Sequence, residues 1–362
     1  MENGKFYFRY RKELSSITFT DMIEDPLLAE VLRCPSCQGT IKQNRCINCT
    51  VSFTDTLGII DLRWPQADYS DHLDPRKQRE DKIIKRIVKH YDTATFEELI
   101  QFTFDIIGVP RGAPEELIEL FQTYRSEQNF RGDQMLSMFR ESIERHFTLP
   151  NEFLALDIGC GVGPSTFSLA KQFQWVIGFD PTMSNLLLAK KYCEENSYSN
   201  VRLIQAYAQN IPLQDNCISF AVAQNVIEHL HDVENAFKEI NRVLISGGCF
   251  CGDSRNRYDL FFPEPHVNIR WLGYFPRSVQ PRVVKRLRGL PYTSVHMLSL
   301  AELRHYSERV FSDSAVITFP HVSTYNRSNR WNMIVNLIGR IPIVRTIVLA
   351  IFPTHLLLAC VK

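Results

Sequence analysis

Four cysteines near the start of the chain stand in two close pairs. Cys34 and Cys37 form one C-x2-C pair, and Cys46 and Cys49 form the other, with eight residues between the pairs. A C-x2-C pair can place both thiolates on one metal ion, and two such pairs complete a tetrahedral site with no open position. Four thiolates select zinc over hard cations. We therefore expect a structural zinc ribbon at residues 34–49, with a redox-active thiol pair as the alternative.

The other six cysteines are scattered along the chain: Cys160, Cys193, Cys217, Cys249, Cys251 and Cys360. A disulfide framework is uncommon in a chain of 362 residues, whereas scattered thiols suit a reducing compartment. Residues 1–21 are polar and charged, without the apolar core of a signal peptide. We expect a cytoplasmic protein in which these six thiols are buried and inert.

A glycine-rich loop follows a short apolar run in the middle of the chain. In the segment LALDIGCGVGP, residues 154–164, Asp157 precedes the alternating glycines Gly159, Gly161 and Gly163. Glycines are needed where the backbone turns sharply and a ligand approaches closely. Pro164 suits the first turn of a helix, but it stands where the dinucleotide-binding pattern G-x-G-x-x-G has its third glycine. The spacing here is G-x-G-x-G instead.

Further motifs follow the loop in order. Asp180 ends a second apolar run, 21 residues after Gly159, where an acidic side chain can accept hydrogen bonds from both ribose hydroxyls of a ligand. Residues 211–220 are IPLQDNCISF, and residues 225–230 are NVIEHL. If the glycines served only to pack the helix against the strand, nothing would require acidic residues at positions 157 and 180.

Over residues 153–253 these motifs resemble the class I methyltransferases that use S-adenosylmethionine (SAM), of the methyltransferase type 11 kind. The resemblance implies a seven-stranded Rossmann-like sheet with SAM as cofactor. It implies cofactor contacts from nine residues: Asp157, Gly159, Cys160, Gly161, Gly163, Asp180, Tyr207, Ala208 and Asn225. The chain departs from the family at Tyr207, where an acidic residue near the adenine is usual, and at Ser219, which replaces an aspartate. Tyr207 could stack on the adenine.

Three side chains are candidates for handling the methyl acceptor. A hydroxyl acceptor needs a general base, whereas a stronger nucleophile needs only alignment and the exclusion of water. The candidates are Glu228, His229 and His266. Each could instead have only a structural role: the histidines could simply fill space, and Glu228 could be a polar helix cap.

Residues 254–288 mix basic and aromatic side chains. The basic ones are Arg255, Arg257, Arg270, Arg277, Arg282, Lys285, Arg286 and Arg288. Arginines can hold phosphate or carboxylate groups, and aromatic rings can stack on a ring of the acceptor. The segment loosely resembles a cap of bacterial methyltransferases that act on small molecules or envelope precursors. The alternative is a solvated cationic face.

The alternation of apolar runs and helical stretches after Pro150 predicts a doubly wound α/β sheet. Residues 63–80 are polar with two prolines and indicate a linker. We expect strands at 153–158, 175–179, 201–206, 218–222, 249–252, 315–319 and 355–361, and the clearest helix at 231–244. The expected divisions are an N-terminal segment with the ribbon (1–65), a helical connector (66–150), the SAM-binding core (151–255), an α-rich cap (256–312) and a segment completing the sheet (313–362).

The expected activity is methyl transfer to oxygen on a small-molecule, glycan or lipid-precursor substrate. A net charge of +1 does not support non-specific binding to nucleic acid. The ribbon is nevertheless similar to those ahead of SAM domains in 23S rRNA guanine methyltransferases, so an rRNA or tRNA base methyltransferase is one alternative. A catalytically silent scaffold is another.

The C-terminal segment 341–361 is strongly apolar. Arg345, Pro353 and His355 interrupt it, which favours a buried helix and a final strand over a segment lying on a membrane surface. Peripheral membrane contact through this segment is the alternative. No pattern in the sequence indicates the oligomeric state.

Overall fold

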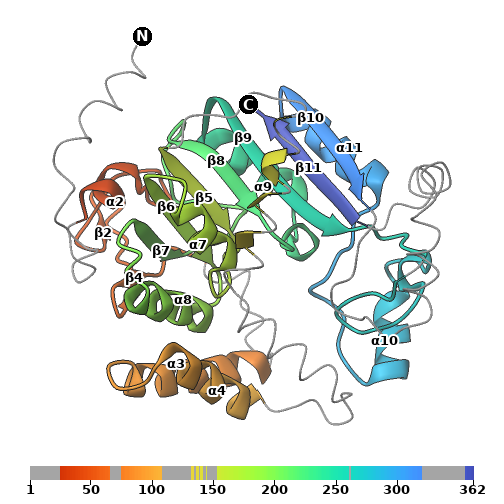
Figure 1. Ribbon diagram of the computed structural model, residues 1–362, viewed down its shortest axis with the longest axis horizontal. Helices are drawn as coiled ribbons and strands as arrows, with labels where there is room; N and C mark the ends of the chain where they lie inside the picture. The colour runs from red at the N-terminus through yellow and green to blue at the C-terminus, as the bar shows by residue number, and fades with distance from the viewer. Residues whose placement is uncertain are drawn as a thin grey trace.

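The computed structural model describes residues 25–65, 75–107, 153–260, 262–319 and 355–362, together with single positions between 132 and 144. A seven-stranded sheet forms its centre, in the order β10-β11-β9-β8-β5-β6-β7 (Figure 1). The strands are β5 (Leu154–Ile158), β6 (Trp175–Asp180), β7 (Val201–Gln205), β8 (Ile218–Ala223), β9 (Leu244–Arg255), β10 (Asp313–Phe319) and β11 (His355–Val361). The predicted Rossmann-like sheet is therefore confirmed.

The sheet starts at its centre and grows in both directions. From β5 the chain runs outward to β6 and β7, and then returns to pair β8 with the other side of β5, all in parallel. Strand β9 pairs in parallel with β8, whereas β11 is antiparallel to both β9 and β10. The order of strands reverses between β5 and β8, and open α/β sheets bind ligands outside the carboxyl ends of the strands at such a point.

Helices cover both faces of the sheet. Strand residues alternate between the faces, so that Leu154, Leu156 and Ile158 belong to one apolar cluster and Ala155 to the other. The first cluster includes α9 (Val233–Val243) and α11 (Leu300–Val310), and the second includes α3 (Pro75–His90), α4 (Phe96–Ile107), α7 (Pro164–Ala170) and α8 (Met183–Glu195). Figure 1 shows α3 and α4 beyond α8 as an outer layer.

The cysteine-rich segment lies against the β7 edge of the sheet. It contains α2 (Pro26–Val31) and two hairpins, β1–β2 (Ile41–Lys42 and Arg45–Cys46) and β3–β4 (Asp55–Thr56 and Ile59–Ile60). The backbone N–H of Leu62 donates to the carbonyl of Gln205 in β7 at 2.8 Å, and that of Arg33 donates to the carbonyl of Pro212 at 2.9 Å. An edge strand otherwise exposes unpaired backbone groups, so this segment closes the sheet on that side.

The cap, residues 256–298, follows β9 and contains η4 (Leu272–Tyr274) and α10 (Gln280–Arg288). It has an apolar cluster of its own, which includes Leu272, Val284 and Tyr292. Figure 1 shows α10 away from the sheet, beyond the end of β9. Helix α11, within the range expected for the cap, instead packs on α9 and β10.

Two local expectations were wrong. The linker expected at 63–80 ends earlier, because α3 begins at Pro75, where a first helical turn tolerates proline. Strand β9 spans Leu244–Arg255 and not only 249–252, because pairing with both β8 and β11 extends it across polar and glycine residues. Residues 108–131 of the expected helical connector, and the helix expected before the final strand within 341–361, lie outside the described residues. Within the described part of the chain, no helix is long and apolar enough to cross a membrane.

Candidate functional site

The glycine loop connects β5 to α7 at the reversal of strand order. Gly159, Gly161 and Gly163 all have positive φ, at 64°, 54° and 99°. A Cβ on Gly159 would lie 2.6 Å from Val226, and one on Gly163 would lie 2.3 Å from the Phe167 ring, so both positions are closed by packing. A Cβ on Gly161 would meet nothing within 4 Å. Gly161 therefore borders open space, as expected where a ligand approaches the main chain.

Two buried carboxylates flank the loop. Asp157 is 1% exposed and accepts a hydrogen bond of 2.5 Å from the Thr166 hydroxyl. Burial raises the pKa of Asp157 to about 7, although the bond from Thr166 opposes the shift. Asp180 accepts hydrogen bonds from Gly161 N at 3.0 Å and from Thr182 N at 2.8 Å, and burial raises its pKa as well.

Neither carboxylate is paired with a Lys, Arg or His side chain of the described residues. Their hydrogen-bond partners are all neutral groups: Thr166 at Asp157, and Gly161, Thr182 and Asn185 at Asp180. Ribose hydroxyls or a positively charged ligand would therefore be favoured between the loop and these groups. The site thus fits SAM, which carries both a ribose and a sulfonium charge.

Glu80 is a third carboxylate at this site, and the sequence did not indicate it. It lies on α3 and accepts hydrogen bonds from both the backbone N–H and the hydroxyl of Ser184, each at 2.8 Å. Burial raises its pKa, and the charge of Asp180 adds to the shift. The two partners are 104 residues apart, so no local pattern could reveal the contact.

The remaining predicted cofactor residues lie at the same ends of the parallel strands. Cys160 is buried in the loop. Tyr207 is half-buried and Ala208 is buried, both just beyond β7. The N–H of Ala206 donates to the Asp180 carbonyl at 3.4 Å, which holds this turn beside the end of β6. Tyr207 is thus within the region where the expectation placed the adenine.

Asn225, the last of these residues, follows β8 with a φ of 52°. Its backbone N–H donates to Asp253 Oδ1 at 2.9 Å. Asp253 is fully buried on β9, and its other oxygen lies 2.9 Å from His355 Nε2 at the start of β11. The sequence indicated neither Asp253 nor His355, because only the antiparallel return of the chain end brings them together.

The three candidate acceptor residues come together. Glu228 and His229 lie on η3 (Ile227–His229), and His266 reaches them from the cap. His266 Nε2 is 3.2 Å from His229 Nε2, and the ligand atoms of all three residues lie within 4.8 Å of one another. Burial raises the pKa of Glu228. Burial alone would lower the pKa of His266, but its hydrogen bond to Glu264 raises it.

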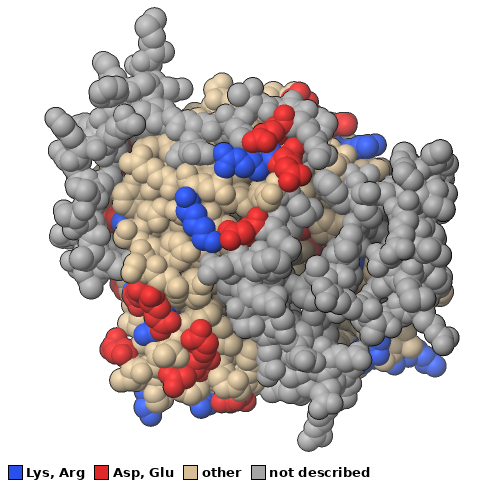
Figure 2. All heavy atoms as spheres, in the orientation of Figure 1, with Lys and Arg blue, Asp and Glu red and all other residues tan. Residues whose placement is uncertain are grey.

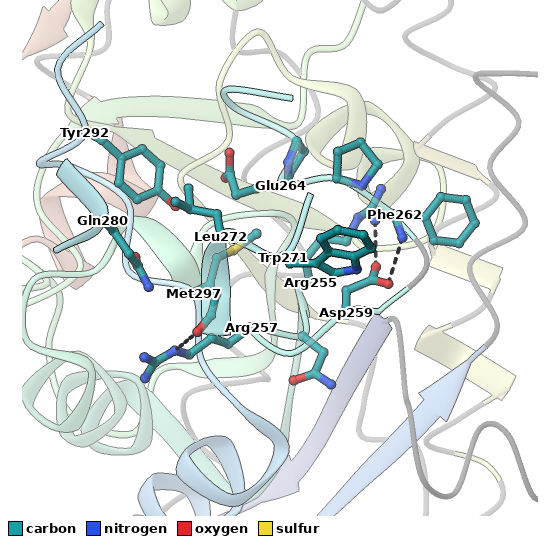
Figure 3. Close-up of a pocket in the computed structure, with 14 residues that line it drawn as sticks. Arg255, Arg257, Asp259, Phe262, Glu264, Trp271, Leu272, Gln280, Tyr292 and Met297 are labelled. Carbon is teal, nitrogen blue, oxygen red and sulfur yellow. Dashed lines mark hydrogen bonds and ion pairs between the residues drawn. The ribbon is translucent and has the colours of Figure 1, made fainter. Parts of the chain in front are cut away.

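A pocket in the cap adjoins this group of three. Figure 3 shows Arg255, Asp259 and Phe262 on one side and Gln280 and Tyr292 on the other. Arg255 pairs with Asp259 at 3.0 Å, so its charge is partly balanced. Polar and aromatic groups both line the pocket, and its free volume of about 20 Å³ has room for about one water molecule.

Several of the basic cap residues hold the cap itself. Arg257 Nε donates to the Gly273 carbonyl at 2.9 Å, Arg288 Nε donates to the Val267 carbonyl at 2.9 Å, and Arg277 pairs with Glu302 at 2.7 Å. These three side chains therefore have structural partners. Of the eight basic residues named from the sequence, Arg255 and Arg257 line the pocket.

The four ribbon cysteines form one cluster. The sulfur atoms of Cys34 and Cys49 are 3.6 Å apart, those of Cys37 and Cys46 are 3.5 Å apart, and all four lie within 4.8 Å of one another. Sulfur atoms 2.3 Å from one tetrahedral zinc ion would be about 3.8 Å apart. The backbone N–H groups of Asn48 and Cys49 point to Cys46 Sγ at 3.4 and 3.5 Å. The cluster fits a tetrathiolate metal site.

The seven-stranded sheet, with a glycine loop at the reversal of strand order, has the fold of SAM-dependent methyltransferase domains. Residues 156–252 match the family model described as a methyltransferase domain. The match covers the glycine loop, Asp180 and the Glu228–His229 pair. The match supports the resemblance of this segment to class I SAM-dependent methyltransferases.

Curated relatives agree with this class. An uncharacterized methyltransferase of Bacillus subtilis, YcgJ, is 27% identical over 164 residues, which are 45% of this chain and 61% of that protein. The demethylmenaquinone methyltransferase of Staphylococcus saprophyticus is 26% identical over 141 residues, 37% of this chain and 60% of that one. The chain thus spans less than two thirds of the length of these relatives.

Solved structures are also similar to the chain. The crystal structure of YcgJ from Bacillus subtilis has a TM-score of 0.39 at 20% identity, covering 62% of this chain and 97% of that one. A geranyl diphosphate C-methyltransferase from Streptomyces coelicolor has a TM-score of 0.44 at 12% identity, covering 70% and 86%.

Proposed function

We propose that the chain is a SAM-dependent methyltransferase that methylates an oxygen of a small-molecule, glycan or lipid-precursor acceptor. The observation that carries the proposal is the open space at Gly161 between two buried carboxylates that have no basic partner among the described residues. A cap with its own apolar cluster places His266 against His229, and this supports an acceptor held beneath the cap.

Different residues of the chain serve the cofactor and the acceptor. When bound, SAM supplies an electrophilic methyl group on a positively charged sulfur. Asp157 and Asp180 provide negative charge beside the loop, and Gly161 leaves room for the ligand. Glu228, His229 and His266 are the groups that can hold the acceptor oxygen or take its proton. Alignment and exclusion of water by the cap would supply much of the rate enhancement.

The cysteines bear on the location of the protein and on a structural metal site. No disulfide joins any of the ten cysteines, which fits a reducing compartment and a cytoplasmic protein. Cys34, Cys37, Cys46 and Cys49 would hold a structural zinc ion, because four protein ligands leave no position for a substrate.

Calorimetry with SAM and with S-adenosylhomocysteine tests the cofactor site. We expect Gly161→Ala to weaken binding at least tenfold, about 1.4 kcal/mol, because the new methyl group would occupy the open space. Gly247→Ala is the matched control, since Gly247 also has positive φ and open surroundings but lies on β9. Equal affinities in these two variants, or no binding to the native protein, would refute the cofactor site.

Transfer itself is tested with SAM carrying a labelled methyl group, added to cell extract fractionated by size. We expect label in small polar or lipid-like molecules, and no label when Asp180→Asn replaces the native protein. Label recovered only in RNA would favour the base-methyltransferase alternative, and its absence from every fraction would favour the silent scaffold.

A further inference from the structure

Glu228, His229 and His266 form a group that the cofactor does not explain. Two of them follow β8 on η3, and the third stands in a cap turn closed by the hydrogen bond between Asn268 N and the Glu264 carbonyl at 2.8 Å. Glu228 is 2% exposed, whereas both histidines are exposed. The group is thus anchored from the buried side and open to a ligand from the other.

Hydrogen bonds determine which ring nitrogens carry protons. His229 Nδ1 lies 3.2 Å from the carbonyl oxygen of Ser294, and His266 Nδ1 lies 2.6 Å from Glu264 Oε1. Both partners are acceptors, so each Nδ1 must be the donor. In a neutral ring the other nitrogen then has a lone pair and no proton. The two Nε2 atoms, 3.2 Å apart, therefore face each other as acceptors.

Two facing acceptors need a cation between or beside them. A shared proton would satisfy the two nitrogens, but it would leave Glu228 Oε2 buried without any hydrogen-bond partner in the described structure. An unpaired buried carboxylate oxygen is costly. A metal ion that also binds this carboxylate satisfies all three groups together.

The distances suit such an ion. Two nitrogen ligands 2.0–2.1 Å from one tetrahedral ion lie about 3.3 Å apart, close to the 3.2 Å between the Nε2 atoms. Histidines that bind metals usually donate their other N–H to a carboxylate or a carbonyl. Here the Glu264 carboxylate accepts from His266 Nδ1, and the Ser294 carbonyl accepts from His229 Nδ1. Glu264 is held in turn by the N–H of Val267 at 2.8 Å and by the Tyr292 hydroxyl.

We propose that His229 Nε2, His266 Nε2 and the Glu228 carboxylate hold a divalent transition-metal ion, with zinc as the leading candidate. Imidazole and carboxylate ligands suit zinc and its neighbours in the series. Three protein ligands leave an open position, in contrast to the ribbon site. An ion there would bind and polarise an oxygen of the acceptor. That role rests on the proposed function, whereas the binding of the ion does not.

The test uses protein produced in medium supplemented with cobalt, which fills both sites during folding. Tetrathiolate cobalt has intense charge-transfer absorption, whereas cobalt with nitrogen and oxygen ligands has weaker bands at shorter visible wavelengths. We expect a second equivalent of cobalt with the weaker spectrum in the native protein. His266→Gln should lose that equivalent and keep the thiolate spectrum, and His305→Gln, an exposed control on α11, should keep both.

Glu264→Gln provides a second variant that keeps all three ligands. We expect it to weaken the second cobalt about 10–100-fold in competition with a chelator, because the hydrogen bond that orients His266 changes. The inference is overturned if native protein holds only thiolate-bound cobalt, or if His266→Gln and native protein hold the same amount. Bound second-site cobalt in a protein that gives no heat with SAM would sustain the metal site and refute the proposed function.

Discussion

At the scale of single residues, Asp157 shows how burial determines the chemistry of a side chain. It lies at the end of a buried strand with one hydroxyl as hydrogen-bond partner. Burial penalises its charged form, and its pKa rises to about 7. A positively charged ligand would favour the ionised form. Asp157 is thus suited to a protein that binds a cation.

The stability of the ligand-free protein should therefore depend on Asp157. An unfolded aspartate has a pKa near 3.9, so between that value and about 7 the native state binds more protons than the unfolded state. The contribution of this group to stability is complete below the lower value and is lost as pH rises through the upper one. From pH 5 to pH 8 we expect the free energy of unfolding of the native protein to fall by roughly 2–3 kcal/mol relative to that of Asp157→Asn.

Urea unfolding of both proteins at a series of pH values measures this difference. Asp157→Asn keeps an oxygen that can accept the Thr166 hydrogen bond, so it serves as the control for the charge alone. Parallel stability curves for the two proteins over this range would show that Asp157 is ionised in both states.

At the scale of elements, the cysteine-rich segment belongs to the same core as the sheet. Cys34, Cys46 and Leu62 share an apolar cluster with strands β5 to β8. Asp25, which caps α2, forms a buried ion pair of 2.6 Å with Arg202 on β7. The segment both completes the core and covers an edge strand, so its metal site should affect the stability of the whole domain.

Removal of the ribbon metal should therefore lower the melting temperature of the sheet as well. We expect Cys37→Ser to lower it by at least about 5 °C, because the folding free energy of a zinc ribbon depends on its metal. Differential scanning calorimetry with and without a strong chelator measures the effect.

The variant His266→Gln separates the two metal sites. It should melt close to the native temperature, and the chelator should add little to the effect of Cys37→Ser. A native protein whose melting does not change with the chelator, while its four ribbon thiols become reactive, would show that the metal does not stabilise the sheet.

At the scale of the whole molecule, positive and negative residues are nearly equal in number. The formal net charge is +1, and Figure 2 shows blue and red side chains together over much of the described face, with basic side chains alone at the lower right. In the cap, Arg257 and Arg288 donate to cap carbonyls and Arg277 pairs with Glu302 on α11. Among the described residues, exposed basic side chains gather on α10, at Arg282, Lys285 and Arg286, a stretch too short to neutralise many phosphates.

We therefore expect weak binding to RNA. Fluorescence anisotropy with a labelled RNA hairpin at 0.15 M salt should give a Kd weaker than about 10⁻⁴ M, the weak end of non-specific binding. Raising the salt should then change little. Micromolar binding with a steep salt dependence would instead support the RNA-methyltransferase alternative.

The sequence by itself determined the sheet and the cofactor loop. A run of apolar residues, Asp157 and alternating glycines specify a strand, a turn and a helix by local chemistry, because glycine alone readily adopts positive φ there. The spacing of Cys34, Cys37, Cys46 and Cys49 likewise predicted one cluster, since each pair needs only a tight turn. Each of these signals is contained in a short stretch of the chain, residues 154–164 for the loop and residues 34–49 for the cysteines.

Only the tertiary structure decided what surrounds these motifs. Glu80 reaches the cofactor site from a helix 104 residues away, and Asp253 meets His355 through the antiparallel return of β11. The sequence named His229 and His266 separately, but their opposed Nε2 atoms result from the cap turning back over η3. Contacts between distant segments depend on how the sheet is wound and covered, and no local pattern of residues specifies them.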